Sequence, residues 1–246
     1  MLSLFRKKKN LPADFSAIAT DMHSHLIPGI DDGAPDTETS IGLIKGLIDL
    51  GYRKIITTPH IFSDLYPNTP AIIEAGYKKV LAEIERLKLS VEFHMAAEYM
   101  MDDVFTSSIE KKEPLLTLKD KMVLVELSFA VPSINLKEIL FNLQVDGYQP
   151  VMAHPERYLY FGANKAWYDE LRSAGCMFQL NLLSFAGYYG RGPQELAQYL
   201  IKKKYVDFLG TDLHHERHLE TIRSSAQIQQ VTGKLLDSGL VRNASL

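Results

Sequence analysis

Histidine and carboxylate side chains recur in short clusters along this chain, and each cluster follows a segment with the pattern of a β-strand. Five of the eight histidines belong to these clusters. In chain order, the candidate metal ligands are His23, His25, Asp32, His60, Glu98, Glu126, His154, Asp212 and His214. Groups so far apart in sequence can share one site only if the fold brings many strand ends together. The pattern therefore constrains the fold as well as the chemistry.

Strand-like and helix-like segments alternate between these clusters. Predicted strands span residues 17–22, 54–58, 91–97, 122–127, 150–153, 177–182 and 206–210. Predicted helices span residues 36–50, 70–87, 136–146, 165–174, 193–203 and 218–238, and residues 102–118 are predicted to form a short helix and a loop. Such alternation implies a parallel sheet, and the nearly continuous apolar strands indicate that both of its faces are covered.

A doubly wound sheet and a closed barrel both satisfy this alternation. A doubly wound sheet builds its site at one crevice from few strands, whereas a barrel gathers side chains from nearly all strand ends at one mouth. Six of the predicted strands offer a candidate ligand, so we expect a distorted seven-stranded (β/α)7 barrel. We expect one domain over residues 18–246, preceded by an N-terminal extension of residues 1–17.

Composition excludes several classes of protein. The formal net charge of −3 argues against a nucleic-acid binder, and the basic run at residues 6–9 is expected to be a solvated tail. No segment approaches the roughly 20 apolar residues of a membrane span. The single cysteine, Cys176, excludes an intrachain disulfide and favours a cytoplasmic location. Leu182 stands where a cysteine phosphatase loop needs arginine, so we expect Cys176 to be a buried, inert thiol.

The spacing of the ligands suggests how they are supported. His23 and His25 are two residues apart and therefore point to the same side of a strand. Asp21 shares that parity and is a candidate hydrogen-bond partner for an imidazole N–H. His94 is expected to be a hydrogen-bonded core histidine, and His215 and His218 are expected at the rim of the site or the start of a helix.

Mixed imidazole and carboxylate ligands suit Zn, Mn or Fe better than Ca or Mg. Nine candidate ligands exceed what one or two ions require, and three ions with about three ligands each are the simplest arrangement. Three divalent ions would outweigh the charge of four carboxylates and attract a phosphomonoester. Bound metal ions also lower the pKa of water toward neutrality and supply hydroxide as a nucleophile.

Arg157 and Arg217 each follow a ligand-bearing motif by three residues. A guanidinium group matches two phosphate oxygens, so both are candidate catalytic residues that hold phosphate; salt bridges to Glu156 and Glu216 are the structural alternative. Four aromatic residues follow ligand-bearing strands and are candidates either for the wall around a substrate ring or for packing: Phe62, Tyr66, Tyr99 and Phe129.

In order, the motifs resemble those of the polymerase and histidinol phosphatase (PHP) superfamily. They are HSH at 23–25, GIDDG at 29–33, TTPH at 57–60, Glu98, Glu126, HPER at 154–157 and DLH at 212–214. GIDDG and AHPER resemble those of the bacterial CpsB/CapC-type protein tyrosine phosphatases. The resemblance covers about residues 18–218. It differs at the start of the chain, because the family motif usually opens the sequence.

The resemblance implies a distorted barrel that holds three metal ions, manganese or iron, with zinc and magnesium as alternatives. It implies hydrolysis of phosphotyrosine on a bacterial tyrosine kinase that controls capsule or exopolysaccharide synthesis. By position, the nine candidate ligands match the metal ligands of the family, and Arg157 matches its phosphate-binding arginine; Arg217 is a weaker match. We hypothesise in-line attack by metal-bound hydroxide, with Asp212 or His214 assisting as acid only where metal binding leaves them free.

Three other functions remain compatible with these residues. One is a phosphatase for a small metabolite such as histidinol phosphate. Another is a nuclease or phosphodiesterase with the same type of metal site, although the composition offers no basic groove. The third is a non-catalytic metal-binding scaffold for a kinase. The number of subunits is left open.

Overall fold

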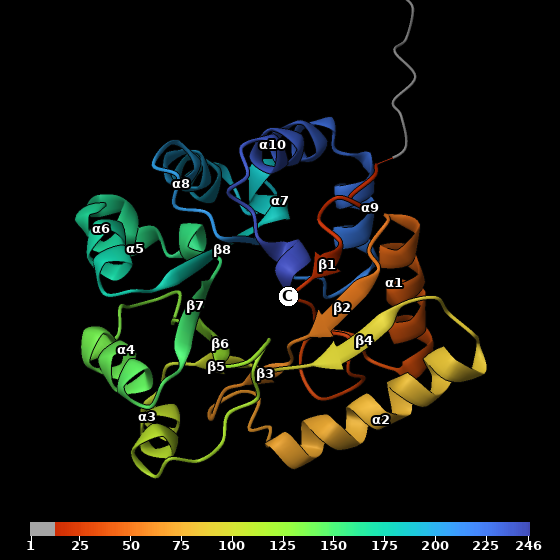
Figure 1. The fold of residues 1–246 in the computed structure, drawn as a ribbon, viewed down its shortest axis with the longest axis horizontal. Helices are drawn as coiled ribbons and strands as arrows, with labels where there is room; N and C mark the ends of the chain where they lie inside the picture. The colour runs from red at the N-terminus through yellow and green to blue at the C-terminus, as the bar shows by residue number, and fades with distance from the viewer. Residues whose placement is uncertain (1–12) are drawn as a thin grey trace, which may run out of the picture.

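The computed structural model describes residues 13–246 and shows strands surrounded by helices (Figure 1). The basic run at residues 6–9 and most of the expected N-terminal extension lie outside the described residues. No helix within residues 13–246 has both the length and the apolar character needed to cross a membrane.

Parallel strands build the central wall of the molecule. In the described residues they form one sheet of order β1–β2–β4 and a second of order β3–β5–β6–β7–β8–β9. The strands are Thr20–Asp21 (β1), Lys54–Thr57 (β2), His60–Ile61 (β3), Glu92–Met95 (β4), Glu98–Met100 (β5), Met122–Glu126 (β6), Gln149–Ala153 (β7), Met177–Asn181 (β8) and Phe208–Gly210 (β9). All neighbours pair in parallel, as the alternation with helices predicts.

The strands predicted over residues 54–58 and 91–97 are each followed, after a short break, by a further strand that was not predicted, β3 and β5. β2 and β3 are separated at Pro59, which has no N–H to donate to the ladder. A second break, between β4 and β5, lies beside the break at Pro59 in the neighbouring strand. Hydrogen bonds from Ala96 N to Thr57 O (2.8 Å) and from Glu98 N to Pro59 O (3.1 Å) continue the pairing across both breaks. The wall therefore has the predicted seven strand positions.

The wall closes between its first and last strands. Ser24, beyond β1, forms a parallel bridge with Leu213, beyond β9. His25 N donates to Leu213 O (2.9 Å), and Asp212 N donates to His23 O (2.8 Å). Farther along the same seam, the buried Asn243 side chain donates to Thr20 O (3.0 Å) and Leu209 O (2.7 Å). The result is the expected distorted (β/α)7 barrel.

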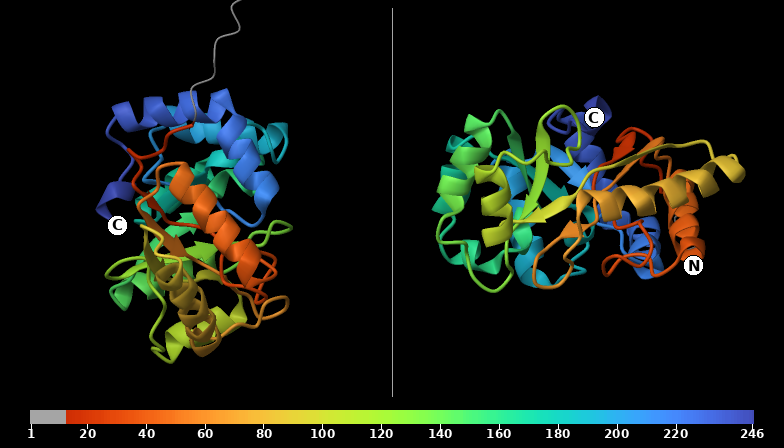
Figure 2. Two further views of the ribbon diagram at one scale, coloured as in Figure 1. Left: turned by 90° about the vertical axis from the view of Figure 1, so that its right-hand side faces the viewer. Right: turned by 90° about the horizontal axis from the view of Figure 1, so that it is seen from below.

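Helices cover the outside of the barrel. They are α1 (Thr37–Asp49), α2 (Pro70–Arg86), α3 (Asp103–Glu110), α4 (Leu136–Val145), α5 (Leu159–Ala163), α6 (Ala166–Ser173), α7 (Leu182–Phe185), α8 (Arg191–Lys202), α9 (Glu216–Ser224) and α10 (Ala226–Asp237), with 3-10 turns η1 (Pro155–Arg157) and η2 (Asn243–Ser245). In the view from below, α1 and α2 lie at one end and α3 and α4 at the other (Figure 2). Asp36 caps α1, since its side chain accepts from Thr39 N.

The C-terminal predicted helix is wrong in one respect. The sequence pattern indicates one helix over residues 218–238, but the structure divides it into α9 and α10 at Ser225. The Ser225 backbone is extended, and its hydroxyl accepts from Ile228 N, so it caps α10 rather than continuing α9. The short helices α5 and α7 were not predicted either.

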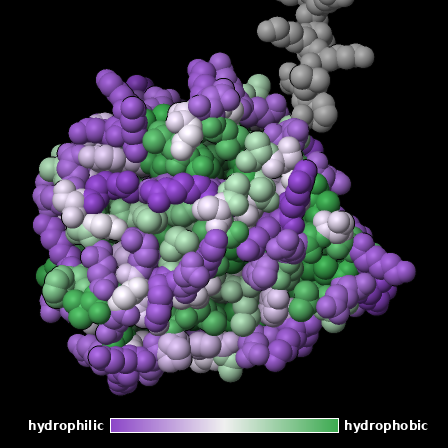
Figure 3. Space-filling model, in the orientation of Figure 1, coloured by the Kyte–Doolittle hydropathy of each residue, from purple (hydrophilic) through white to green (hydrophobic). Residues whose placement is uncertain are grey.

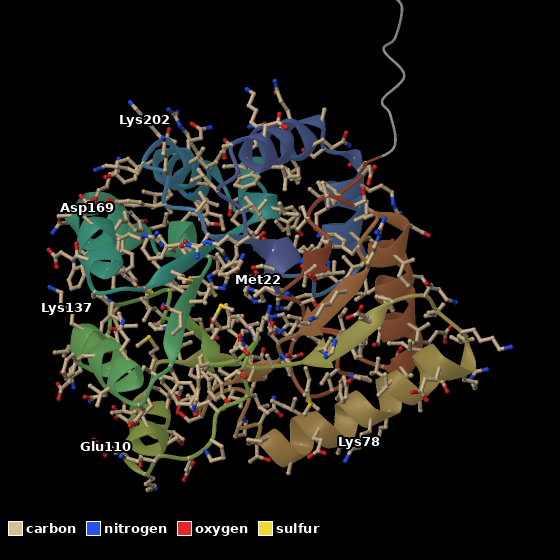
Figure 4. All side chains as sticks on the ribbon, in the orientation of Figure 1. Met22, Lys78, Glu110, Lys137, Asp169 and Lys202 are labelled. Atoms are coloured by element: carbon tan, nitrogen blue, oxygen red, sulfur yellow. The ribbon has the colours of Figure 1, made fainter. Side chains whose placement is uncertain are left out.

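Two apolar clusters stabilise the fold. The larger one packs the helices against the outside of the strands. The smaller one fills the barrel with Met22, Ile56, Ala96, Leu118, Leu124, Val151, Ala153, Phe208 and Leu246. Met22 accordingly lies at the centre of the molecule, whereas Lys78, Glu110, Lys137, Asp169 and Lys202 project from the outer helices (Figure 4). On the face that contains the C-terminus, hydrophilic residues dominate the outline and hydrophobic patches lie between them (Figure 3).

Candidate metal centre

All nine predicted ligands converge near one end of the barrel, with His60 and Glu98 just beyond the breaks that follow β2 and β4. They form four groups whose ligand atoms lie within 4.8 Å of one another: His25, Asp32, His60 and His214; His23, His154 and Asp212; His23, His25 and Glu98; and His60, Glu98 and Glu126. The groups share members and therefore make one continuous cluster. A cavity of about 250 Å³ opens onto it, lined among others by Asp32, Glu126, Arg157 and His214.

Glu98 lies at the centre of this cluster. Its Oε2 atom is 3.1 Å from His23 Nε2, 3.4 Å from His25 Nε2 and 3.2 Å from His60 Nδ1. Among the described residues this buried oxygen has no hydrogen-bond donor in suitable geometry. Two ligands of a tetrahedral ion, each about 2.1 Å from it, lie about 3.4 Å apart. The spacing around Glu98 thus fits a carboxylate that bridges bound metal ions.

Electrostatic coupling within the cluster is strong. Burial lowers the pKa of His23, but the charges of Glu98 and Asp212 outweigh this effect and raise it above its usual value. Burial opposes ionisation of Asp212, yet His23 and His214 hold its pKa well below the usual range. Imidazoles and carboxylates therefore neutralise one another in this arrangement. Metal cations can take the place of the protons on these imidazoles and balance the carboxylates. A set of imidazole and carboxylate ligands suits transition metals.

The Nδ1 atoms of His23 and His25 are each held by a neighbouring side chain. Gln179 Oε1 lies 2.7 Å from His23 Nδ1, and Asp31 Oδ2 lies 2.9 Å from His25 Nδ1. These contacts leave both Nε2 atoms directed at Glu98, which is how supporting residues orient metal-binding imidazoles. The prediction that Asp21 supports an imidazole is wrong. Asp21 instead accepts from Thr211 N (3.1 Å) and Thr211 Oγ1 (3.0 Å) at the barrel seam.

Arg157 lines the cavity beside the cluster. Its Nη1 donates to Asp212 Oδ2 (2.8 Å), and the same oxygen accepts from Asn181 Nδ2 (2.8 Å). The guanidinium carbon lies 4.6 Å from the centre of the Phe129 ring and 4.1 Å from that of Tyr189. The alternative salt bridge with Glu156 is not formed. Glu156 is buried and accepts from Asn181 N and Ser184 Oγ, both at 2.8 Å.

Other predicted residues lie farther from the cluster. Arg217 is exposed on α9 and is not among the residues that line the cavity. His215 precedes α9 and His218 lies in its first turn, and both line the cavity rim as expected. The expectation for His94 is wrong: its side chain is 51% exposed and lies 3.7 Å from that of Glu92, because these two residues share the exposed face of β4 while Phe93 between them is buried.

The four candidate aromatic residues differ in their distance from the cluster. Phe129 lines the cavity, and the Tyr66 ring stacks on His60 with 5.3 Å between ring centres. Tyr99 belongs to the core, where its hydroxyl accepts from Leu116 N (2.7 Å). Phe62 forms a backbone bridge with Tyr66.

Gln179, Asn181 and Tyr189 were missed by the sequence reasoning. Gln179 and Asn181 end β8, the predicted strand without a histidine or acid at its C-terminal end. Their spacing of two residues places both on one face, and this signal could have identified them. Tyr189 lies in the loop between α7 and α8, for which the sequence carries no comparable signal.

Two of the candidate ligands have unusual backbone conformations. His154 and Asp212 adopt φ values of 34° and 50°, in the left-handed region that non-glycine residues rarely occupy. Such strain is concentrated at functional sites, where the surrounding structure holds it in place.

The sequence of this chain matches a described family and curated proteins. Residues 19–242 match the family described as capsular polysaccharide synthesis, CpsB/CapC. The chain is 28% identical over 229 residues to the tyrosine-protein phosphatase YwqE of Bacillus subtilis, covering 92% of this chain and 90% of that protein. It is 25% identical over 194 residues to the putative tyrosine-protein phosphatase CapC of Staphylococcus aureus, covering 79% and 76% of the two chains.

Solved structures show the same relationship. A structure from a study of YwqE from Bacillus subtilis and CpsB from Streptococcus pneumoniae, described as metal-dependent tyrosine phosphatases, superposes with a TM-score of 0.74. Its identity to this chain is 25%, and the match covers 91% of this chain and 94% of the other. Histidinol phosphate phosphatase from Lactococcus lactis shares the fold at a TM-score of 0.51 and 15% identity, with coverage of 87% and 92%. From its sequence match, its barrel and its strand-end cluster, this chain is a member of the CpsB/CapC family of capsular polysaccharide synthesis.

Proposed function

We propose that this protein is a metal-dependent phosphatase that hydrolyses phosphotyrosine in proteins. The observation that carries the proposal is the cluster around Glu98, which opens into a cavity with Arg157 on its wall. The names of the relatives from Bacillus subtilis and Staphylococcus aureus support phosphotyrosine as the substrate.

We further propose that the cluster holds three ions, manganese or iron, through the nine ligands. Glu98 belongs to two of the four groups and is the residue best placed to bridge ions. When bound, such ions activate water as a nucleophile and polarise the phosphoryl oxygens. The ligands of this chain fix the positions of the ions, and Gln179 and Asp31 hold the two imidazoles that complete the inner part of the cluster.

The role of Arg157 follows from its surroundings. Asp212 engages one guanidinium nitrogen, and the other nitrogens are available for two phosphate oxygens. We propose that Arg157 binds the phosphoryl group and stabilises the charge that develops during hydrolysis. A phenol has a pKa near 10, so tyrosine leaves readily and needs little protonation. The exposed position of Arg217 supports only a role at the outer edge of the substrate.

The physiological substrate is proposed to be a tyrosine kinase of capsule or exopolysaccharide synthesis. Support comes from the description of the family as one of capsular polysaccharide synthesis. A cytoplasmic location is part of the proposal and rests on the presence of a single, buried cysteine, Cys176. Burial raises the pKa of the Cys176 thiol to about 12. That raised pKa also argues against Cys176 as a nucleophile.

The test is a substrate panel combined with metal removal. We expect a chelator to abolish hydrolysis of phosphotyrosine peptides and added Mn²⁺ to restore it, while Cys176→Ser leaves turnover nearly unchanged. Phosphotyrosine should be preferred to phosphoserine and to histidinol phosphate. Full activity of the metal-free protein would reject the mechanism, and a strong preference for histidinol phosphate would identify a small-metabolite phosphatase instead.

A further inference from the structure

Exposed hydrophobic side chains gather at one rim of the barrel. Nine large hydrophobic residues are exposed among residues 13–246. Six of them follow the C-terminal ends of β3, β5, β6 and β7: Leu65, Val104, Phe129, Val131, Ile134 and Leu159. The same strands carry His60, Glu98 and Glu126, and the HPER turn follows β7, so these segments leave the end of the barrel that holds the cluster. Of the six apolar residues, Phe129 lines the cavity itself.

The other side of the rim is polar. The segment after β9 exposes His215, Glu216 and Arg217, and the segment after β1 contributes the half-exposed Asp32. Exposed large hydrophobic residues that follow neighbouring strands near a cavity are typical of an interaction surface. Apolar groups of a bound molecule would therefore lie on the side of the cavity that carries the exposed hydrophobic residues.

Phe129 connects this patch to the chemistry. Its ring lines the cavity and packs on Arg157. Phe129 belongs to the β6–α4 loop, residues 127–135, which also exposes Val131 and Ile134. Ile134 is fully exposed, and Val131 is 63% exposed. A group bound against Arg157 would therefore continue directly onto this loop. Near the ends of β3 and β5, a further cavity of about 290 Å³ has Ile61, Tyr99 and Val104 in its wall.

We propose that the β6–α4 loop is the docking surface for apolar side chains that flank phosphotyrosine in a polypeptide substrate. The inference rests on the proposed function and deepens it. A small metabolite that fills a cavity of about 250 Å³ has no atoms to reach Val131 or Ile134. A polypeptide does, because its neighbouring side chains extend beyond the cavity on both sides of the phosphorylated residue.

The test compares two phosphotyrosine peptides of equal length and charge, one with leucine and the other with serine on both sides of the phosphotyrosine. We expect the wild-type protein to hydrolyse the leucine peptide with about tenfold higher kcat/KM, as burial of one or two apolar side chains predicts. Val131→Ser and Ile134→Ser should remove most of that preference. Hydrolysis of p-nitrophenyl phosphate, which has no flanking residues, should stay unchanged.

A matched control lies on the outer helix that follows the loop. Val145 in α4 is 66% exposed, close to the value for Val131, but lies near the far end of that helix. Val145→Ser should keep the full preference for the leucine peptide. An equal loss of preference in Val145→Ser, or a change only in the oligomeric state of Val131→Ser, would overturn the proposal, the latter by assigning the patch to contacts between copies.

Failure of the inference and failure of the proposed function give different results. If the wild-type protein hydrolyses both peptides equally well, the docking surface is refuted and the phosphatase activity stands. If the metal-loaded wild-type protein hydrolyses neither peptide nor p-nitrophenyl phosphate, the proposed function itself is refuted, and the docking surface with it.

Discussion

Single side chains set the geometry of the phosphate end of the site. Arg157 is fixed by a hydrogen bond to Asp212 and by rings from both neighbouring strand positions, Phe129 after β6 and Tyr189 after β8. Because β6 and β8 flank β7, the two rings approach the guanidinium from different sides. The planar group is thereby held in one orientation before any substrate arrives, which reduces the entropy lost on binding.

Arg157→Ala should lower kcat/KM for phosphotyrosine about a hundredfold, because charge-assisted hydrogen bonds to the phosphoryl group are lost. Steady-state kinetics combined with metal analysis checks this. The metal content should stay normal, since Arg157 is not in any of the ligand groups. Loss of bound metal in the variant would reassign Arg157 as a structural residue.

Tyr189 acts through Arg157 and is therefore a positioning residue. Its hydroxyl accepts from Asn181 Nδ2 at 3.2 Å, and its ring packs on the guanidinium. Tyr189→Leu should lower kcat/KM roughly three- to tenfold through loss of the cation–π contact. Tyr189→Phe should restore most of the activity because the ring remains. Equal losses in the two variants would show that the hydroxyl, not the ring, matters.

At the scale of elements, β8 differs from the other strands at the site. It contributes no ligand, but its amides, Gln179 and Asn181, hold His23 and Asp212. The strand positions and the convergence of the nine candidate ligands and Arg157 on one site were predictable, because apolar runs and clustered imidazoles are local signals. The spacing of Gln179 and Asn181 shows that they share a face, but their contacts with His23 and Asp212 depend on closure of the barrel, which brings β8 near β1 with β9 between them. The exposure of His94 was likewise not predictable. Its even spacing from Glu98 indicates which face of the strand it lies on, but not whether other residues cover that face.

The turn after β7 is joined to β8 by Glu156. This buried carboxyl accepts from Asn181 N and Ser184 Oγ, and burial raises its pKa from 4.5 to about 7. The folded protein thus keeps a proton on Glu156 that the unfolded chain releases near pH 4.5. The stability that this group contributes is complete below that pH and is lost as the pH rises through about 7.

Glu156→Gln removes this titration without changing the shape of the side chain. The free energy of unfolding of the wild type, relative to the variant, should therefore fall by roughly 3 kcal/mol between pH 4.5 and 8. Denaturant unfolding across this range measures it. Glu195→Gln, which removes a carboxylate from an exposed pair on α8, is the control and should show a flat difference. A flat difference for Glu156→Gln as well would contradict the raised pKa.

At the scale of the whole molecule, the seam between β1 and β9 decides whether the barrel is complete. Asn243 donates to Thr20 O and Leu209 O and accepts from Leu209 N at 2.9 Å. Beyond it, the Asp21 carboxylate binds Thr211 and the backbone joins residues 23–25 to residues 212–213. One buried amide thus replaces the ladder bonds that a regular barrel would have there.

Asn243→Ala should lower the free energy of unfolding by about 2–4 kcal/mol, because it leaves buried backbone groups of β1 and β9 without partners. Thermal and denaturant unfolding after metal removal are the measurements. Ser245→Ala, whose exposed hydroxyl donates to Arg242 O, is the matched control and should change stability by less than about 0.5 kcal/mol. Similar losses in both variants would show that the segment, not the amide, is responsible.

Because the seam includes Asn243, the barrel can close only after almost the whole chain has been synthesised. Thr20 and Asn243 are separated by 223 positions, so β1 leaves the ribosome long before its partner exists. Throughout that interval one edge of the nascent sheet stays open and available to other chains. We expect the growing polypeptide to depend on chaperones during synthesis, and the candidate metal ligands beside that edge, His23 and His25, to join the rest of the cluster only after the ring has closed.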